Sequence, residues 1–130
     1  MENRSDFYAA VEAIVERDGR YRAEAYHFLM LALSYTVAQL PEPRHVSGRE
    51  LLEGIRRYAL EQFGPMAKTV FEHWGVLETM DFGRIVFRLV DAELLAKTET
   101  DRLEDFSGAY DFEAAFVRDY PWGAVAGHAE

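Results

Sequence analysis

A metal site is the first chemistry that the residue types of this sequence could support. Glu24 and His27 are three positions apart, so a helix would place them on one face, and a carboxylate–imidazole pair at this spacing binds metal in helical di-metal proteins. Such a site needs a second pair, whereas Glu72 and His73 are adjacent and would point to different faces. We therefore expect no bound metal, and Glu24 and His27 stay as weak candidate ligands.

Nucleophilic catalysis and nucleotide binding have still less support. The sequence has no cysteine, which excludes thiolate nucleophiles, thiolate metal sites and disulfides. No serine lies in the G-x-S-x-G pattern of a nucleophile elbow, and neither G-x-G-x-x-G nor a Walker-type loop occurs. We therefore expect no catalytic residue and no cofactor, and the sequence favours a non-enzymatic protein.

Residues 74–95 have the order of a helix-turn-helix, which in winged-helix proteins is followed by a β-hairpin. A short helix is predicted to end near Gly75 and a second to begin near Thr79, and strands are predicted over 95–100 and 106–110 with a turn between them. The turn after Gly75 is longer than in the compact motif. A winged-helix-like domain and another helical domain with a short hairpin therefore both remain open.

Arg84 and Arg88 are the residues that could contact DNA from the second helix. Asp81 precedes Arg84 by three positions and Asp91 follows Arg88 by three, a spacing that indicates ion pairs along an outward, solvated helix face. The chain has 23 acidic and 14 basic residues, a formal net charge of -9, which opposes binding to phosphate. The predicted hairpin is itself acidic, with Glu99, Asp101, Glu104 and Asp105. We expect no strong nucleic-acid binding.

The C-terminal third interleaves acidic residues with aromatic ones. The aromatic residues are Phe106, Tyr110, Phe112, Phe116, Tyr120 and Trp122. If they are exposed, they form a protein-docking surface, because aromatic anchors within a charged rim are typical of interfaces. If they pack inward, they form a lid over the helices. On the first interpretation, the candidate interaction residues are Arg84, Arg88, Glu104, Asp105, Phe106 and Tyr110.

Helices must position all of these residues. Apolar residues at helical spacing predict helices over 6–18, 21–40, 47–63, 65–74 and 79–95, and a last short helix over 112–120. The stretch 21–40 is the most apolar and is predicted to be the central helix, with Phe28, Leu29, Ala32 and Tyr35 buried. The fold class is therefore mainly α, with about five helices and a short β-hairpin near the C-terminus.

Local signals refine these predictions. Ser47 and Glu50 have the spacing of a capping box, while Thr79 and Asp111 are expected to cap the helices that follow them. Gly54 lies in the middle of a predicted helix, where glycine costs up to about 1 kcal/mol relative to alanine. We therefore expect Gly54 to mark a close contact with another helix.

Length and composition indicate one globular domain over residues 1–130, with fraying expected at residues 1–5 and 123–130. Hydrophobic residues make up 49% of the chain, which is enough to build a core without disulfides. The polar N-terminal segment does not resemble a signal peptide, so the expected location is cytoplasmic. Residues 21–40 are interrupted by His27, Ser34 and Thr36 and favour a buried helix over a membrane span.

Five short segments carry a resemblance to a family of small uncharacterised bacterial proteins. They are HVSG at 45–48, FGPMA at 63–67, WG at 74–75, T-x-DFG at 79–83 and DF at 105–106. The resemblance covers most of residues 6–120 and implies a bacterial, cytosolic, single-domain protein. It brings no activity, cofactor or catalytic residue with it.

The function that the sequence favours is a non-enzymatic protein-interaction domain, acting on a protein partner or by self-association. A winged-helix DNA-binding transcriptional regulator is the alternative, and a metal-binding helical protein is the third possibility. The charge that faces outward from residues 79–105 distinguishes the first two, because a DNA-binding surface must be basic.

Overall fold

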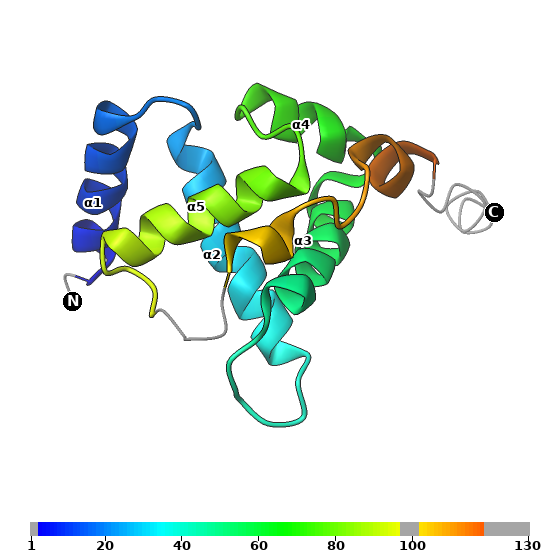
Figure 1. Ribbon diagram of the computed structural model, residues 1–130, viewed down its shortest axis with the longest axis horizontal. Coiled ribbons are helices and arrows are strands. Elements are labelled where there is room, and N and C mark those ends of the chain that lie inside the picture. The colour runs from blue at the N-terminus through cyan, green and yellow to red at the C-terminus, as the bar shows by residue number, and fades with distance from the viewer. Residues whose placement is uncertain (1–2, 97–101, 119–130) are drawn as a thin grey trace.

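The computed structural model describes residues 3–96 and 102–118, which form a mainly α fold (Figure 1). The α-helices of these residues are α1 (Asn3–Arg17), α2 (Ala23–Ala38), α3 (Gly48–Phe63), α4 (Ala67–His73) and α5 (Thr79–Asp91). Two 3₁₀ helices, η1 (Gly64–Met66) and η2 (Leu103–Phe106), and a π-helical turn, η3 (Ala114–Arg118), complete them. The predicted fold class is confirmed at this level.

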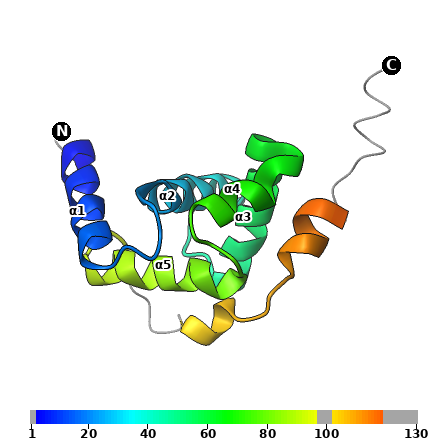
Figure 2. The same cartoon turned by 90° about the horizontal axis from the view of Figure 1, so that it is seen from above.

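Helix α2 is central, as predicted. It contacts α1, α3 and α5. Figure 2 shows α1 standing at one end of the molecule, and Figure 1 shows α5 crossing α2. Leu29 and Ala32 are fully buried, and Phe28 is nearly so. Tyr35 is an exception to the prediction. It is only half-buried, because its hydroxyl reaches the surface and donates a hydrogen bond to Glu61 at 2.8 Å.

Gly54 lets α2 and α3 pack closely, which confirms the role expected for it. A Cβ atom at Gly54 would lie 1.7 Å from Oγ1 of Thr36 on α2. The Thr36 hydroxyl donates to the carbonyl oxygen of Ala32 at 2.7 Å, so this buried polar group has its partner within its own helix. The two helices therefore approach at a point where neither has a long side chain.

Aromatic rings fill much of the core. Phe71 of α4 lies at the centre of the cluster, and its ring has neighbours on several elements, namely Phe28, Phe63, Trp74, Phe82, Phe112 and Phe116. The ring centroids of these pairs are 5.2 to 6.4 Å apart, the range in which edge-to-face and offset contacts are favourable. Residues far apart in sequence are thereby held in one core.

The helix starts follow the sequence signals only in part. The Ser47 hydroxyl accepts from the Glu50 N–H at 3.1 Å, and the Ser47 N–H donates to the Glu50 carboxylate at 2.8 Å, which confirms the capping box. Asp111 accepts from the Ala114 N–H at 3.0 Å, as expected of a cap. Thr79 is not the cap of α5, because Glu78 holds that position and the Thr79 hydroxyl is engaged elsewhere.

The predicted hairpin is not seen in the residues that the structure describes. The second strand was expected over 106–110, but Phe106 ends η2 and a turn follows it. The Thr79 hydroxyl donates to the carbonyl oxygen of Phe106 at 2.6 Å and accepts from the Ala109 N–H at 3.2 Å. These backbone groups are therefore held by a side chain of α5 rather than by a partner strand. Most of the first strand, 95–100, falls in residues 97–101, outside the described part.

Helix α5 ends earlier than the predicted residue 95. It closes after Asp91, where Glu93 adopts a left-handed conformation with φ 64°. The N–H of Leu94 donates to the carbonyl oxygen of Leu89 at 2.8 Å, and the N–H of Glu93 donates to that of Val90 at 2.9 Å. This pair of bonds is a Schellman motif. Within the described ranges, no helix combines the length and apolar content that crossing a bilayer requires.

Candidate functional site

Asp81, expected on the outward face of α5, is buried with only 2% of its surface exposed. Its carboxylate accepts hydrogen bonds from the Tyr21 hydroxyl, from the backbone N–H of Leu77 at 2.8 Å and from that of Glu78 at 3.2 Å. The predicted pairing with Arg84 is confirmed, at 2.8 Å. The carboxylate thus joins the start of α5 to the turn before α2.

The pKa shifts of this pair follow from its surroundings. Burial by itself raises the pKa of Asp81, but the hydrogen bonds from Tyr21, from two backbone N–H groups and from Arg84 outweigh it, so the pKa is lowered. Burial and the hydrogen bond to Asp81 raise the pKa of Tyr21 to about 12. Asp81 therefore stays charged and Tyr21 stays neutral, which suits a structural network rather than proton transfer.

Arg88 does not pair with Asp91, which corrects the expectation from their spacing. Its guanidinium forms an ion pair with Asp18 after α1, and it lies 3.4 Å from the hydroxyl of Tyr26. The guanidinium carbon lies 5.1 Å from the centroid of the Tyr21 ring, within the range of a cation–π contact. Arg88 therefore links α5 to the end of α1 and to α2, whereas Arg84 pairs with Asp81 of its own helix.

The remaining candidate interaction residues divide between surface and core. Glu104 is exposed, while Asp105 is half-buried and accepts from the Arg102 N–H at 3.3 Å. Phe106 is only 3% exposed. The Tyr110 hydroxyl donates to the carbonyl oxygen of Leu52 at 2.8 Å, and burial raises the pKa of this phenol. Phe112 and Phe116 are buried as well. Among the described residues, the aromatic side chains of the C-terminal third therefore form the lid and not the docking surface. Tyr120 and Trp122 lie outside the described residues.

The weak metal candidates, Glu24 and His27, have different surroundings. Glu24 is exposed, whereas the half-buried His27 ring packs against Phe7 and Tyr8 of α1, with centroids 5.2 and 4.6 Å away. Burial lowers the pKa of His27, and the nearby charge of Glu24 only partly opposes this. Across residues 3–96 and 102–118, no three His, Asp or Glu side chains are grouped closely enough to hold a metal ion. His27 packs here as an aromatic ring.

An exposed, mainly apolar strip on α1 and α2 includes His27 and was not predicted from the sequence. We define the strip as Tyr8, His27 and Leu31, of which Tyr8 is 46% and Leu31 56% exposed. Ser34 and Ala38, which continue the same face of α2, are also exposed. No Asp, Glu, Lys or Arg occurs from residue 25 to residue 40. The sequence signal for this strip was that apolar residues occur on all faces of the helix over 23–38. A helix that is apolar on every side is expected to be covered on every side.

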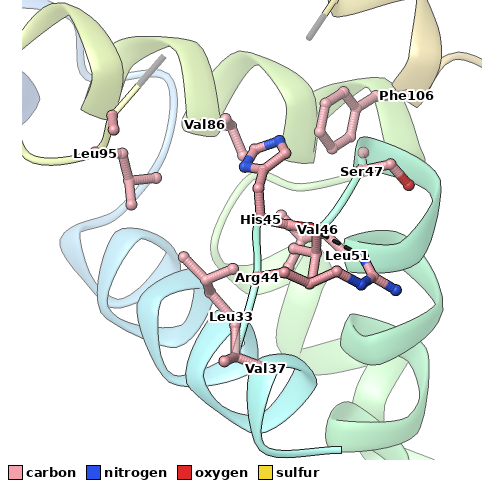
Figure 3. A pocket seen from close by; sticks show the side chains of 12 residues that line it. Leu33, Val37, Arg44, His45, Val46, Ser47, Leu51, Val86, Leu95 and Phe106 are labelled. Atoms are coloured by element: carbon pink, nitrogen blue, oxygen red, sulfur yellow. Dashed lines mark hydrogen bonds between the residues drawn. The ribbon is translucent and has the colours of Figure 1, made fainter. Parts of the chain in front are cut away.

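A pocket of about 260 Å³ lies between α2, α3 and α5 (Figure 3). Its walls are mostly apolar. Leu33 and Val37 come from α2, Leu51 from α3 and Val86 from α5, and Leu95 and Phe106 complete them. The loop between α2 and α3 runs through the site and contributes Arg44, His45 and Ser47. The pocket was not predicted, because its walls come from segments that are far apart in sequence.

Phe106 forms a fixed wall of this pocket. A Cβ atom at Gly83 of α5 would lie 2.7 Å from the Phe106 ring, and one at Gly48 of α3 would lie 3.0 Å from it. The ring therefore fits between two helices only because both lack a side chain there. Three of the segments noted in the sequence, HVSG, T-x-DFG and DF, meet at this ring.

The fold and these surfaces define a mainly α protein with an apolar pocket and an exposed, uncharged helix face. No protein-family model, curated protein or solved structure matches the chain. Its functional assignment therefore depends on the geometry described above.

Proposed function

We propose that the chain is a non-enzymatic protein-interaction domain and that it docks through the strip formed by Tyr8, His27 and Leu31. The observation that supports this most directly is the 56% exposure of Leu31 in the middle of a mainly apolar helix that has no charged residue after Glu24. A helix without a polar face is normally covered on all sides. Here the described residues cover only part of α2, and a partner would cover the rest.

A second copy of the chain is the first partner to expect. Each copy has a formal net charge of -9, so two copies repel each other through most of their surfaces. The strip has no full charge at neutral pH, because burial lowers the pKa of His27 and favours the neutral ring. Contact through His27 and Leu31 therefore removes apolar surface from water where residues 25–40 contain no carboxylate.

A two-fold axis through Leu31 fits this face. It would run the two α2 helices antiparallel, place Leu31 against its own copy and place His27 near the Tyr35 position of the other copy. Glu24, the charged residue at the start of the strip, is seven positions before Leu31, so the two Glu24 carboxylates would be about 21 Å apart along the helices. A parallel arrangement would bring them together.

Sedimentation equilibrium tests the proposal with a matched pair of charge variants. Leu31→Glu adds a carboxylate to the strip, and Thr69→Glu adds the same charge at an exposed position of α4. We expect the wild type and Thr69→Glu to form dimers in the micromolar range, whereas Leu31→Glu should stay monomeric. A monomeric wild type, or a Leu31→Glu variant that dimerises equally well, contradicts self-association.

Affinity purification of the tagged chain from its native host tests the broader assignment. Proteins recovered with the wild type and Thr69→Glu, but lost with Leu31→Glu, would be partners that use the strip. If all three forms recover the same proteins, the strip is not the docking surface.

A further inference from the structure

The pocket between α2, α3 and α5 has the size of a small ligand. Its volume of about 260 Å³ exceeds the roughly 150 Å³ of an engineered apolar cavity that binds benzene. It falls below the range of about 300 to 1,000 Å³ that is typical of sites for larger ligands and cofactors. One ring with a short substituent, or a short branched chain, fits this space, whereas a nucleotide does not.

The polar groups at the pocket already have partners in the chain. Arg44 donates to both carboxylate oxygens of Glu50, at 3.1 and 2.9 Å, and to the carbonyl oxygen of His45 at 2.9 Å. Ser47 and Glu50 are occupied by the capping box. His45 also has an interaction of its own within the chain. An anionic ligand would meet an arginine whose charge Glu50 already offsets, whereas an apolar ligand needs no polar partner and leaves these interactions in place.

The apolar walls are formed before any ligand arrives. Figure 3 shows Leu33 and Val37 on α2 facing the side where Val86 and Phe106 lie. The Phe106 ring is fixed between Gly48 and Gly83, and its carbonyl oxygen is held by the Thr79 hydroxyl. A fixed wall reduces the entropy that binding must remove, so even a small ligand gains measurable affinity.

We infer that this pocket binds a neutral, mainly apolar small molecule that has a single ring or a short branched chain. This site is separate from the strip on α2 and does not depend on the proposed docking function. Pocket filling removes apolar surface from water on both partners, and no polar group of the chain loses a hydrogen bond.

Amide NMR titrations with benzyl alcohol and benzoate test the inference, because the two probes share a ring and differ in charge. Benzyl alcohol should shift the amide signals of Val46, Val86 and Ala96 progressively, with a dissociation constant of about 1 mM or tighter. Benzoate should bind at least about ten-fold more weakly, since its carboxylate would lose water beside apolar walls and beside an Arg44 whose charge Glu50 already offsets.

Two leucine-to-phenylalanine variants locate the binding. Leu33→Phe places extra volume in the pocket and should abolish the benzyl alcohol shifts. Leu77→Phe makes the same change at a side chain that is 66% exposed outside the pocket, and should leave them unchanged. If the spectrum of Leu33→Phe shows loss of folding, Val37→Phe replaces it.

Three results would overturn the inference. They are the absence of saturable shifts with benzyl alcohol, binding of benzoate that is as tight as that of the alcohol, and unchanged binding in a folded pocket-filling variant. The oligomeric state measured in the same samples shows separately whether the chain self-associates through the strip. Lack of ligand binding in the pocket is therefore distinguished from lack of self-association.

Discussion

Asp81 connects three parts of the chain through one buried carboxylate. It accepts from the Tyr21 hydroxyl, from two backbone N–H groups at the start of α5 and from Arg84. A buried carboxylate costs desolvation energy, which only well-placed donors offset. Its lowered pKa shows that the donors outweigh that cost. The residue therefore stabilises the packing of α5 against the turn before α2.

We predict that Asp81→Asn lowers the free energy of unfolding by about 2 to 4 kcal/mol. The amide group keeps the shape of the side chain but replaces one acceptor oxygen with a donor, so either the two backbone N–H groups or the Tyr21 hydroxyl and Arg84 lose their acceptor. Urea denaturation at neutral pH measures the change. Asp91→Asn is the control on the same helix, at an exposed position, and should change stability by less than about 0.5 kcal/mol. Equal effects of both changes would contradict the role of Asp81.

The sequence predicted one half of this network. The three-residue spacing of Asp81 and Arg84 predicted their pairing correctly, because neighbours on a helix are fixed by its geometry. Tyr21 is 60 residues away, and nothing in local periodicity indicates that its hydroxyl reaches Asp81. The predictions that Asp81 faces outward and that Arg88 pairs with Asp91 were wrong for the same reason, because the true partners of both residues lie far away in the sequence.

At the level of elements, α2 provides a direct comparison between a buried and an exposed leucine. We predict that Leu29→Ala lowers the free energy of unfolding by about 2 to 5 kcal/mol, because it leaves a cavity in the core. Leu31→Ala removes the same atoms from a side chain that is 56% exposed, and should cost much less in the monomer. Thermal melts of both variants at low protein concentration measure the difference. Equal shifts would mean that α2 is not the central helix.

Helix existence was easier to predict than helix ends. The capping box at Ser47 fixed the start of α3, because its signal lies within four residues. The end of α5 has no such signal. Glu93, not a glycine, adopts the left-handed conformation there, so apolar periodicity alone predicted a helix up to residue 95. The strand expected over 106–110 is replaced by a turn tied to Thr79, a contact across 27 residues.

The candidate site shows the same limit. Gly54 in the middle of a helix predicted a close contact between helices. The position of Phe106 between Gly48 and Gly83 could not be predicted in this way, because it depends on three segments that meet only in the folded chain. The pocket depends on that convergence. Sequence patterns therefore predicted the helices, and the surfaces between helices came only from the structure.

For the whole molecule, tyrosine ionisation should limit stability at alkaline pH. The pKa of Tyr21 is raised to about 12, and that of Tyr110 is raised as well, whereas a tyrosine in the unfolded chain titrates near 10. From pH 10 upwards the unfolded chain therefore releases protons that the folded chain keeps, and stability falls as pH rises toward 12. We predict that urea midpoints decline over this range and that Tyr21→Phe makes the decline shallower. Tyr8→Phe, at an exposed position, should leave its slope unchanged.

The distribution of charge over the molecule bears on DNA binding. The chain has a formal net charge of -9, and Arg84 and Arg88 are engaged with Asp81 and Asp18. DNA affinity depends on cations that replace the counterions of phosphate, and an arginine already paired with a carboxylate contributes little to that exchange. Arg88 also links α5 to Asp18 and Tyr26, so its release would cost contacts between helices as well as an ion pair.

We predict that the chain binds duplex DNA no more tightly than the weak non-specific range of about 10⁻⁴ to 10⁻⁶ M at physiological salt. Fluorescence titrations against random and native genomic fragments, at several salt concentrations, measure the affinity. The charge-reversal variant Glu104→Lys gives a scale for the effect of one added cation, since it makes an exposed position of η2 basic and should strengthen binding only slightly. Nanomolar binding by the wild type, lost on Arg84→Ala or Arg88→Ala in variants that stay folded, would favour a DNA-binding regulator. Phosphate would then have to compete with Asp81 or Asp18 for these guanidinium groups, and the Arg88–Asp18 ion pair, which links α5 to the end of α1, would lie in the binding surface.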